Sequence, residues 1–236
     1  MSQLQLNALN YKEFYGRSTE QMPILIAEGR TPLSIAGLMR RRLEVLNSSD
    51  EVKRFYWDNY FDTGDGIAYH PDGRGKIVLD AQPLRELTPL SSSQLRNGAL
   101  VLPSGVYDRL EGVEFSREDL AKYITGGRLK QGNVKKNRVW QVLARDENLL
   151  NDYSEAVFSQ LRERYNEDRA MGLYRGSAEN VPTMRSWYLN RLDDRSGAGG
   201  NIHLCYDLGR LVGVAPEAQS ATQTVARSTL DQIVKQ

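Results

Sequence analysis

The sequence predicts an α+β fold in which helices pack against a single, mostly antiparallel sheet. Strand-like runs are scattered among helical segments without the regular strand–helix alternation of a parallel sheet. Two of these runs, GIAYH and KIVLD, flank an Asp-Gly turn in PDGRG, which is typical of an antiparallel hairpin. We therefore expect a hairpin at about residues 66–80.

Four short apolar runs bounded by turn-forming residues are the remaining strand candidates. Their lengths suit buried strands. They are expected at about residues 22–28 (MPILIAE), 99–103 (ALVLP), 202–207 (IHLCYD) and 210–215 (RLVGVA).

Helices are predicted from capping residues followed by apolar residues at helical spacing. The longest should run from about 147 to 168, with Leu150, Tyr153, Val157, Leu161 and Tyr165 along one stripe. Further helices are expected to begin at 31, 50, 106, 116, 182 and 216.

The length of 236 residues fits one large domain. Residues 21–236 are expected to form it, preceded by a polar arm at 1–20 that is a candidate for disorder. The basic stretch from Gly126 to Arg138 contains glycine and asparagine, so it is the best candidate for an internal linker.

Composition and sequence pattern argue against charge-driven binding, export and insertion into a membrane. The formal charge is +1, from 31 basic and 30 acidic side chains, so no global field favours nucleic acid or membranes. A lone Cys205 and the lack of a signal-like apolar leader indicate a reducing, cytoplasmic location. No apolar run approaches the roughly 20 residues needed to span a bilayer, so we expect no membrane association.

The segment FDTGDGIAYHPDG contains the densest group of potential metal ligands, namely Asp62, Asp65, His70 and Asp72. Carboxylates and an imidazole can bind a divalent metal that activates water. The alternative is structural, because Asp and Gly are also the residues of helix caps and turns.

A weaker group consists of His203, Cys205 and Asp207. Alternate residues of a strand at 202–207 would project from one face and could ligate a metal. The alternative is a half-buried strand in which Cys205 behaves as a small apolar side chain.

Basic clusters suggest contact with nucleic acid or with a protein partner, provided that they converge in space. Interleaved Asp and Glu leave a solvated helix face as the alternative. The candidate residues are Arg40, Arg41, Arg42, Arg128, Lys130, Lys135, Lys136 and Arg138.

No complete catalytic motif occurs, so we assign no catalytic residue and no firm cofactor. The best interpretation is a noncatalytic intracellular binding or assembly protein that contacts nucleic acid or a protein through Arg-rich and aromatic surfaces. The alternative is a metal-dependent hydrolase centred on residues 62–72, with a divalent metal as its cofactor. A homo-oligomer or a structural subunit of a larger assembly also fits.

Overall fold

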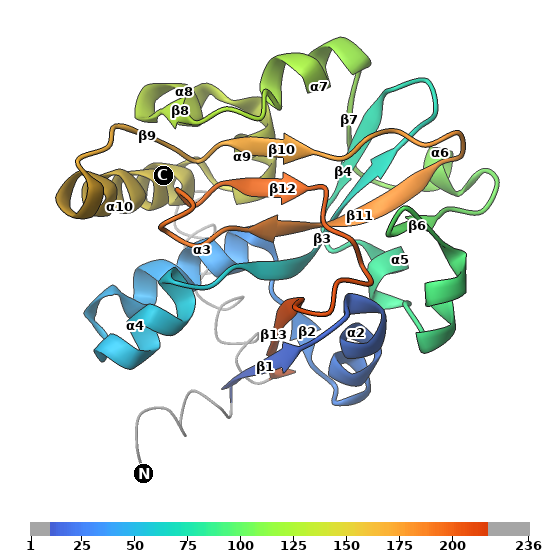
Figure 1. The fold of residues 1–236 in the computed structure, drawn as a ribbon, viewed down its shortest axis with the longest axis horizontal. Coiled ribbons are helices and arrows are strands. Elements are labelled where there is room, and N and C mark those ends of the chain that lie inside the picture. Colours follow the sequence, from blue (N-terminus) through green and yellow to red (C-terminus); the bar gives the residue numbers. More distant parts are fainter. Residues whose placement is uncertain (1–9, 217–236) are drawn as a thin grey trace, which may run out of the picture.

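A computed structural model describes residues 10–216, which form a central sheet covered by helices (Figure 1). The sheet has eight strands in the order β10-β12-β11-β3-β4-β7, and β5 and β6 continue it beside β11. Apart from the parallel β10–β12 pair, the strand pairs of this sheet are antiparallel. The predicted α+β class with a mostly antiparallel sheet is confirmed.

The predicted hairpin is confirmed and forms part of the sheet centre. Strand β3 (Phe61–Tyr69) pairs with β4 (Gly75–Val78), with Tyr69 opposite Gly75. Gly73 in the connecting turn has φ +96°, a backbone conformation that favours glycine. Strand β3 begins at Phe61, earlier than the sequence suggested. All nine of its residues are buried, so the strand is covered on both faces.

The other central strand, β11 (Thr183–Leu189), occupies residues that the sequence suggested were helical. It pairs antiparallel with β3 along most of its length. The helix prediction is wrong. The Pro-Thr start resembles a helix cap, but Thr, Trp and Tyr also suit strands. Pairing with β3 decides in favour of the strand.

The remaining strands of this sheet are short and lie toward its edges. The predicted strand at 99–103 is confirmed as β6. The edge strands are β5 (Leu95–Arg96), β6 (Ala99–Val101), β7 (Val113–Phe115), β10 (Leu173–Arg175) and β12 (Ala198–Gly200).

A small second sheet has the order β1-β13-β2 and lies below the main one in Figure 1. Strand β13 (Arg210–Val214) confirms the strand predicted at 210–215, and β2 is Thr31–Pro32. Strand β1 (Tyr11–Tyr15) lies within the segment expected as a polar arm. Its Phe14 is buried, which gives this polar stretch an apolar anchor in the core.

Helix α2 (Ser18–Ala27) replaces the strand predicted at 22–28, and that prediction is wrong. Met22 and Leu25, three residues apart, are buried on one face, whereas Ile24 is 46% exposed. An unbroken apolar run of this length does not distinguish a strand from a buried helical turn.

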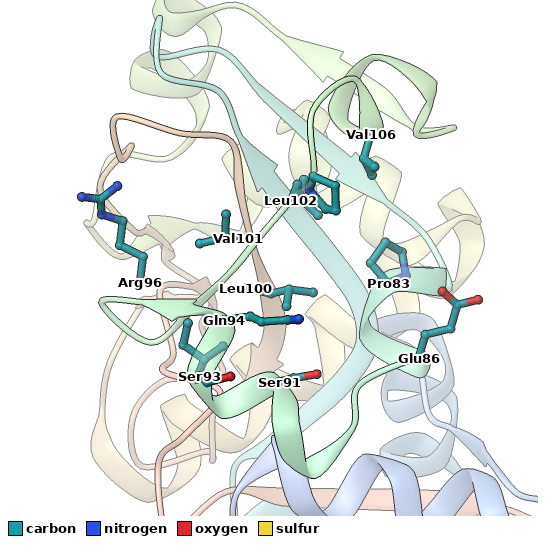
Figure 2. A pocket seen from close by; sticks show the side chains of 12 residues that line it. Pro83, Glu86, Ser91, Ser93, Gln94, Arg96, Leu100, Val101, Leu102 and Val106 are labelled. Atoms are coloured by element: carbon teal, nitrogen blue, oxygen red, sulfur yellow. The ribbon is translucent and has the colours of Figure 1, made fainter.

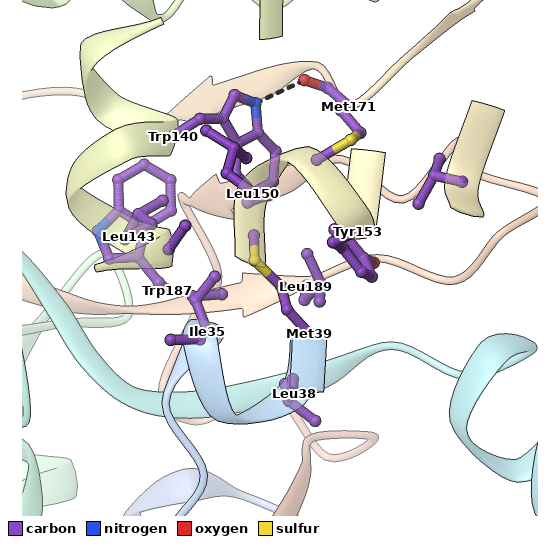
Figure 3. Packing of buried hydrophobic residues seen from close by; sticks show 14 of the residues in the cluster. Ile35, Leu38, Met39, Trp140, Leu143, Leu150, Tyr153, Met171, Trp187 and Leu189 are labelled. Carbon is purple, nitrogen blue, oxygen red and sulfur yellow. Dashed lines mark hydrogen bonds between the residues drawn. The ribbon is translucent and has the colours of Figure 1, made fainter. Parts of the chain in front are cut away.

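Four helices build the main core on one face of the sheet. Side chains from α3, α9, α10 and β11 interdigitate there, and Trp140 donates to the carbonyl oxygen of Met171 at 2.8 Å (Figure 3). Helix α10 confirms the longest predicted helix and ends at Asn166, which has φ 52°. These helices are α3 (Ile35–Glu44), α4 (Asp50–Trp57), α9 (Arg138–Ala144) and α10 (Glu147–Tyr165).

Short helices complete the surface. The segment suggested as a linker forms β8 (Leu129–Lys130), which pairs with β9 (Arg169–Ala170), and α8 (Gln131–Lys136). The others are α5 (Gln82–Arg85), α6 (Val106–Arg109) and α7 (Arg117–Tyr123), with 3-10 helices η1 (Val45–Asn47) and η2 (Pro89–Gln94). The polar helix expected from 216 onward lies, after its first residue, outside the described residues.

Within residues 10–216, no helix combines the length and apolar character that a membrane span requires.

Candidate binding surface

The four residues of the acidic segment do not form one site. Asp62 and Asp65 are buried on β3, while His70 and Asp72 lie in the hairpin turn, where His70 Nδ1 is 2.9 Å from Asp72 Oδ1. Across residues 10–216, no group of three or more His, Cys, Asp or Glu side chains is arranged to hold a metal ion. The local density of ligands in the sequence reflects two strand residues and a turn.

Asp65 belongs to a structural ion-pair network. Its Oδ1 lies 2.5 Å from Nη2 of Arg145, which also contacts Asp80 at 2.7 Å. The carboxylate accepts the backbone N–H of Ile35 at 2.8 Å. Burial raises the pKa of Asp65, although the Arg145 charge acts in the opposite direction. The network ties the start of α3 and the end of α9 to the central strand.

Asp62 is also buried, but no guanidinium or ammonium of residues 10–216 pairs with it. Its Oδ2 accepts a hydrogen bond from Ser18 Oγ at 3.3 Å, and the backbone N–H of Arg210 also donates to it. Its Oδ1 has no hydrogen-bond partner among the described residues. Burial raises the pKa of this carboxyl to about 7.

His203, Cys205 and Asp207 do not lie on a strand, so the strand predicted at 202–207 is wrong. Residues 201–209 form turns, in which Tyr206 N donates to the carbonyl oxygen of His203 at 3.0 Å. The three side chains therefore do not share a strand face, and Asp207 is paired with Arg17. Apolar alternation occurs here because Leu204 anchors the loop in the core.

Two of the basic candidates are structural. Arg42 is fully buried and donates to the carbonyl oxygens of Tyr56 and Asn59 and to the hydroxyl of Tyr153. The guanidinium carbon of Arg41 lies 4.3 Å from the ring centroid of Tyr11. Both side chains therefore contribute little to any exposed basic surface.

The other basic candidates lie on separate elements. Arg40 is on α3, Lys135 and Lys136 are on α8, and Lys130 is in β8. Two have specific contacts: Arg128 pairs with Glu167 at 3.0 Å, and Arg138 lies over the Phe115 ring at 5.1 Å.

A different surface, which the sequence did not suggest, gathers exposed aromatic side chains. Tyr15, Tyr206 and Leu208 are 51%, 44% and 49% exposed. The Tyr60 hydroxyl donates to the carbonyl oxygen of Leu208, and Tyr15 and Tyr206 are both near enough to influence the pKa of Tyr60. We call Tyr15, Tyr60, Tyr188, Tyr206 and Leu208 the tyrosine surface.

The tyrosine surface includes a pocket of about 350 Å³. Its aromatic walls are Tyr60, Tyr188 and Tyr206, and its other lining residues are mostly polar. Those residues are Asn190, Arg191, Asp194, Asn201 and Ile202. The pocket therefore combines aromatic area with hydrogen-bonding groups.

The phenol groups of Tyr60 and Tyr188 stay neutral at physiological pH. Burial, with a further contribution from the Asp62 carboxylate, raises the pKa of Tyr60 to about 12. Burial also raises the pKa of Tyr188 to about 12. Neither Tyr60 nor Tyr188 is therefore prepared to act as a tyrosinate base or nucleophile.

Backbone hydrogen bonds hold the 201–209 loop against the rest of the fold. Leu204 N donates to Gly98 O at 2.8 Å, and Thr19 N donates to Leu204 O at 3.2 Å. Gly16 N donates to Gly209 O at 2.8 Å, which joins this loop to the end of β1. Tyr206 and Leu208 are thus presented by a loop that needs little ordering upon binding.

A second pocket, of about 710 Å³, lies beside β6, α5 and η2 (Figure 2). Leu100, Leu102 and Val106 supply much of its apolar lining, and Glu86 and Arg96 are the charged residues. It contains none of the site residues expected from the sequence.

Comparison with known proteins bears on the fold. No family model matches the sequence, and no curated protein matches it. A solved structure described as "Accommodation of massive sequence variation in Nanoarchaeota by the C-type lectin fold" is similar, with a TM-score of 0.63 and 17% sequence identity. The similarity covers 86% of this chain and 97% of that chain. The chain therefore has a fold similar to the C-type lectin fold.

Proposed function

We propose that this chain is a noncatalytic binding protein that recognises a protein partner through the tyrosine surface. The main support is the gathering of exposed Tyr15, Tyr206 and Leu208 around a tyrosine-lined pocket. Tyrosine offers a large amphipathic contact area with few rotatable bonds, and it is enriched in binding surfaces. Exposed aromatic clusters of this kind mark interaction sites.

The groups around the aromatic residues favour a polypeptide ligand. Asn190 and Asn201 supply amide donors and acceptors, while Arg191 and Asp194 provide exposed charges that pair with each other at 2.8 Å. An aromatic centre with a polar, solvent-accessible rim is the usual anatomy of a protein interface. The rim would select a partner with complementary hydrogen-bonding groups.

The fold supplies a rigid base for such a surface. Side chains at the pocket come from the connection between α4 and β3, from β11 and the turn after it, and from the 201–209 loop. The central strands β3 and β11 are largely buried. The similar solved structure is described as a fold that accommodates massive sequence variation. A scaffold with that property suits a binding role, because its surface side chains can change while its core remains constant.

The rival functions expected from the sequence have weaker support. Burial of Arg41 and Arg42 leaves nucleic-acid binding dependent on Arg40 and on the cluster between 128 and 138. The separation of Asp62 and Asp65 from His70 and Asp72 leaves the metal-dependent hydrolase without a gathered ligand set. We therefore favour a protein partner.

The proposal is tested by capture followed by direct titration. The full chain is immobilised and exposed to an extract of the cells that encode it, and each retained polypeptide is purified and titrated by calorimetry. Tyr206→Ala should weaken the affinity at least about tenfold, as expected for an aromatic anchor. Ile24→Ala is the control, because Ile24 is 46% exposed, close to the 44% of Tyr206, and lies on α2, outside the pocket.

Three outcomes would contradict the proposal. One is equal weakening by the Tyr206 and Ile24 variants, and another is the absence of any polypeptide that binds tighter than about 100 μM. The third is salt-sensitive binding of single-stranded or duplex DNA or RNA that the Tyr206 variant leaves unchanged, which would restore the nucleic-acid interpretation.

A further inference from the structure

A polar pocket of about 410 Å³ lies away from the tyrosine surface, between three segments. One is the hairpin turn at 71–73, the second is the first part of α7, and the third is the stretch after β10 at 175–178. Its volume lies within the range of small-molecule sites.

Two arginines line this pocket without a counter-ion. The guanidinium groups of Arg117 and Arg175 form neither a hydrogen bond nor an ion pair with any residue of the 10–216 region. By contrast, Arg74 in the same hairpin forms ion pairs with Asp72 at 2.9 Å and with Glu114 at 2.8 Å. Two unpaired guanidiniums beside one hollow create a local excess of positive charge.

Local packing fixes the stem of Arg117. A Cβ atom at Gly73, which has φ +96°, would lie 2.9 Å from Arg117 Cδ and 3.1 Å from Arg117 Cγ. The aliphatic part of Arg117 therefore lies flat on the glycine of the turn. This contact restricts the side chain and lowers the entropy that it loses when it binds a ligand.

Arg175 lies beside the buried floor of the pocket. Its charge is near enough to Tyr69 to lower the pKa of that phenol, while burial raises the pKa more strongly. The Tyr69 hydroxyl donates to Gly200 O at 2.9 Å and accepts from Gly176 N at 3.0 Å. With its hydroxyl committed, Tyr69 offers the pocket an aromatic ring, next to the apolar side chain of Leu120.

Further positive charge and free donors lie along the third segment. Buried Arg185 donates hydrogen bonds to the carbonyl oxygens of Ile202 and Asn97. Its Nε has no partner among the described residues and lies 3.0 Å from the position that a Cβ atom on Gly176 would occupy. Ser177 forms no hydrogen bond to any other residue in the described part of the chain, so its hydroxyl and N–H are available.

We propose that this pocket binds a small organic phosphate monoester, with Arg117 and Arg175 holding the phosphate and Tyr69 and Leu120 contacting the organic group. A phosphate dianion matches two guanidiniums, each of which can donate two parallel hydrogen bonds. Ser177 supplies a further donor. Asp72 also lines the pocket, but Arg74, 2.9 Å away, compensates its charge.

Phenyl phosphate is the probe for the test, with phenol and inorganic phosphate as its two halves. Calorimetry and phosphorus NMR should detect phenyl phosphate binding at least about tenfold tighter than either half alone, because only the monoester uses both the arginines and the floor. Arg117→Gln and Arg175→Gln should each weaken it about tenfold through loss of charge-assisted hydrogen bonds. Arg109→Gln, on α6 and outside the pocket, is the matched control and should leave the affinity unchanged.

The Arg117 and Arg175 side chains are exposed, so both variants should fold, and their thermal transitions verify this. The proposal is overturned if phenyl phosphate does not bind, if phenol binds equally well, or if neither arginine variant weakens binding. Equal affinity for inorganic phosphate and phenyl phosphate would overturn the assigned role of Tyr69 and Leu120. None of these results depends on the tyrosine surface, whose test uses other residues.

Discussion

Neutralising Asp62 should change how the stability of the protein depends on pH. Burial raises the pKa of this carboxyl from an ordinary value of 3.8 to about 7, so between these values the folded state binds one more proton than the unfolded state. The contribution of the protonated Asp62 carboxyl to the stability of the folded state is fully present below pH 3.8 and is lost as the pH rises through 7. At about 1.36 kcal/mol per pH unit, the loss amounts to about 4 kcal/mol.

The assay is urea denaturation of the wild type and Asp62→Asn at half-unit steps from pH 4 to pH 8. The asparagine side chain stays neutral, so subtracting its unfolding free energy removes the titration of other groups. The difference should decline by about 4 kcal/mol across this range and level off above pH 7. Parallel profiles for the two proteins would refute the reasoning, and a carbon NMR titration of Asp62 would show whether its pKa is ordinary.

Three other substitutions test the structural assignments, each by urea denaturation at pH 7. Arg42→Met should lose about 3 kcal/mol, since it leaves two buried acceptors and one part-buried acceptor without their donor, and unchanged stability would contradict its structural role. Arg145→Gln should lose about 3 kcal/mol by leaving Asp65 buried and uncompensated, and a second change, Asp65→Asn, should recover part of that loss; no recovery would count against the pair. Gly200→Ala should lose about 1–3 kcal/mol because its Cβ would lie 2.3 Å from a side-chain carbon on β3, whereas Gly132→Ala, with open space around it, should lose nothing.

The sequence predicted correctly those elements whose conformation is determined by residues within the segment itself. The Asp-Gly turn between apolar runs specifies the β3–β4 hairpin, and the long apolar stripe specifies α10. The α2 and β11 segments were misassigned because their short apolar runs suit either state. Pairing with β3 determines the conformation of β11, and such a long-range contact cannot be predicted from the residues of β11 alone.

The tyrosine surface could not be predicted for a related reason. Tyr15, Tyr60 and Tyr206 come from distant parts of the chain and meet only after β1 and the 201–209 loop have docked. In the opposite direction, the sequence cluster from Asp62 to Asp72 is dispersed. Asp62 contacts Ser18 and Asp65 contacts Arg145, while His70 and Asp72 lie in the hairpin turn. Composition nevertheless pointed to aromatic surfaces in a binding protein, which is the function that we propose.

Hydrogen–deuterium exchange of the chain with its purified partner tests the central claim most directly. Backbone amides protected upon complex formation should map to residues 58–60, 188–194 and 201–209, where the exposed tyrosines and the polar rim lie. Protection confined to α8 and α10, or to the pocket beside β6, with those three segments unchanged, would contradict the account.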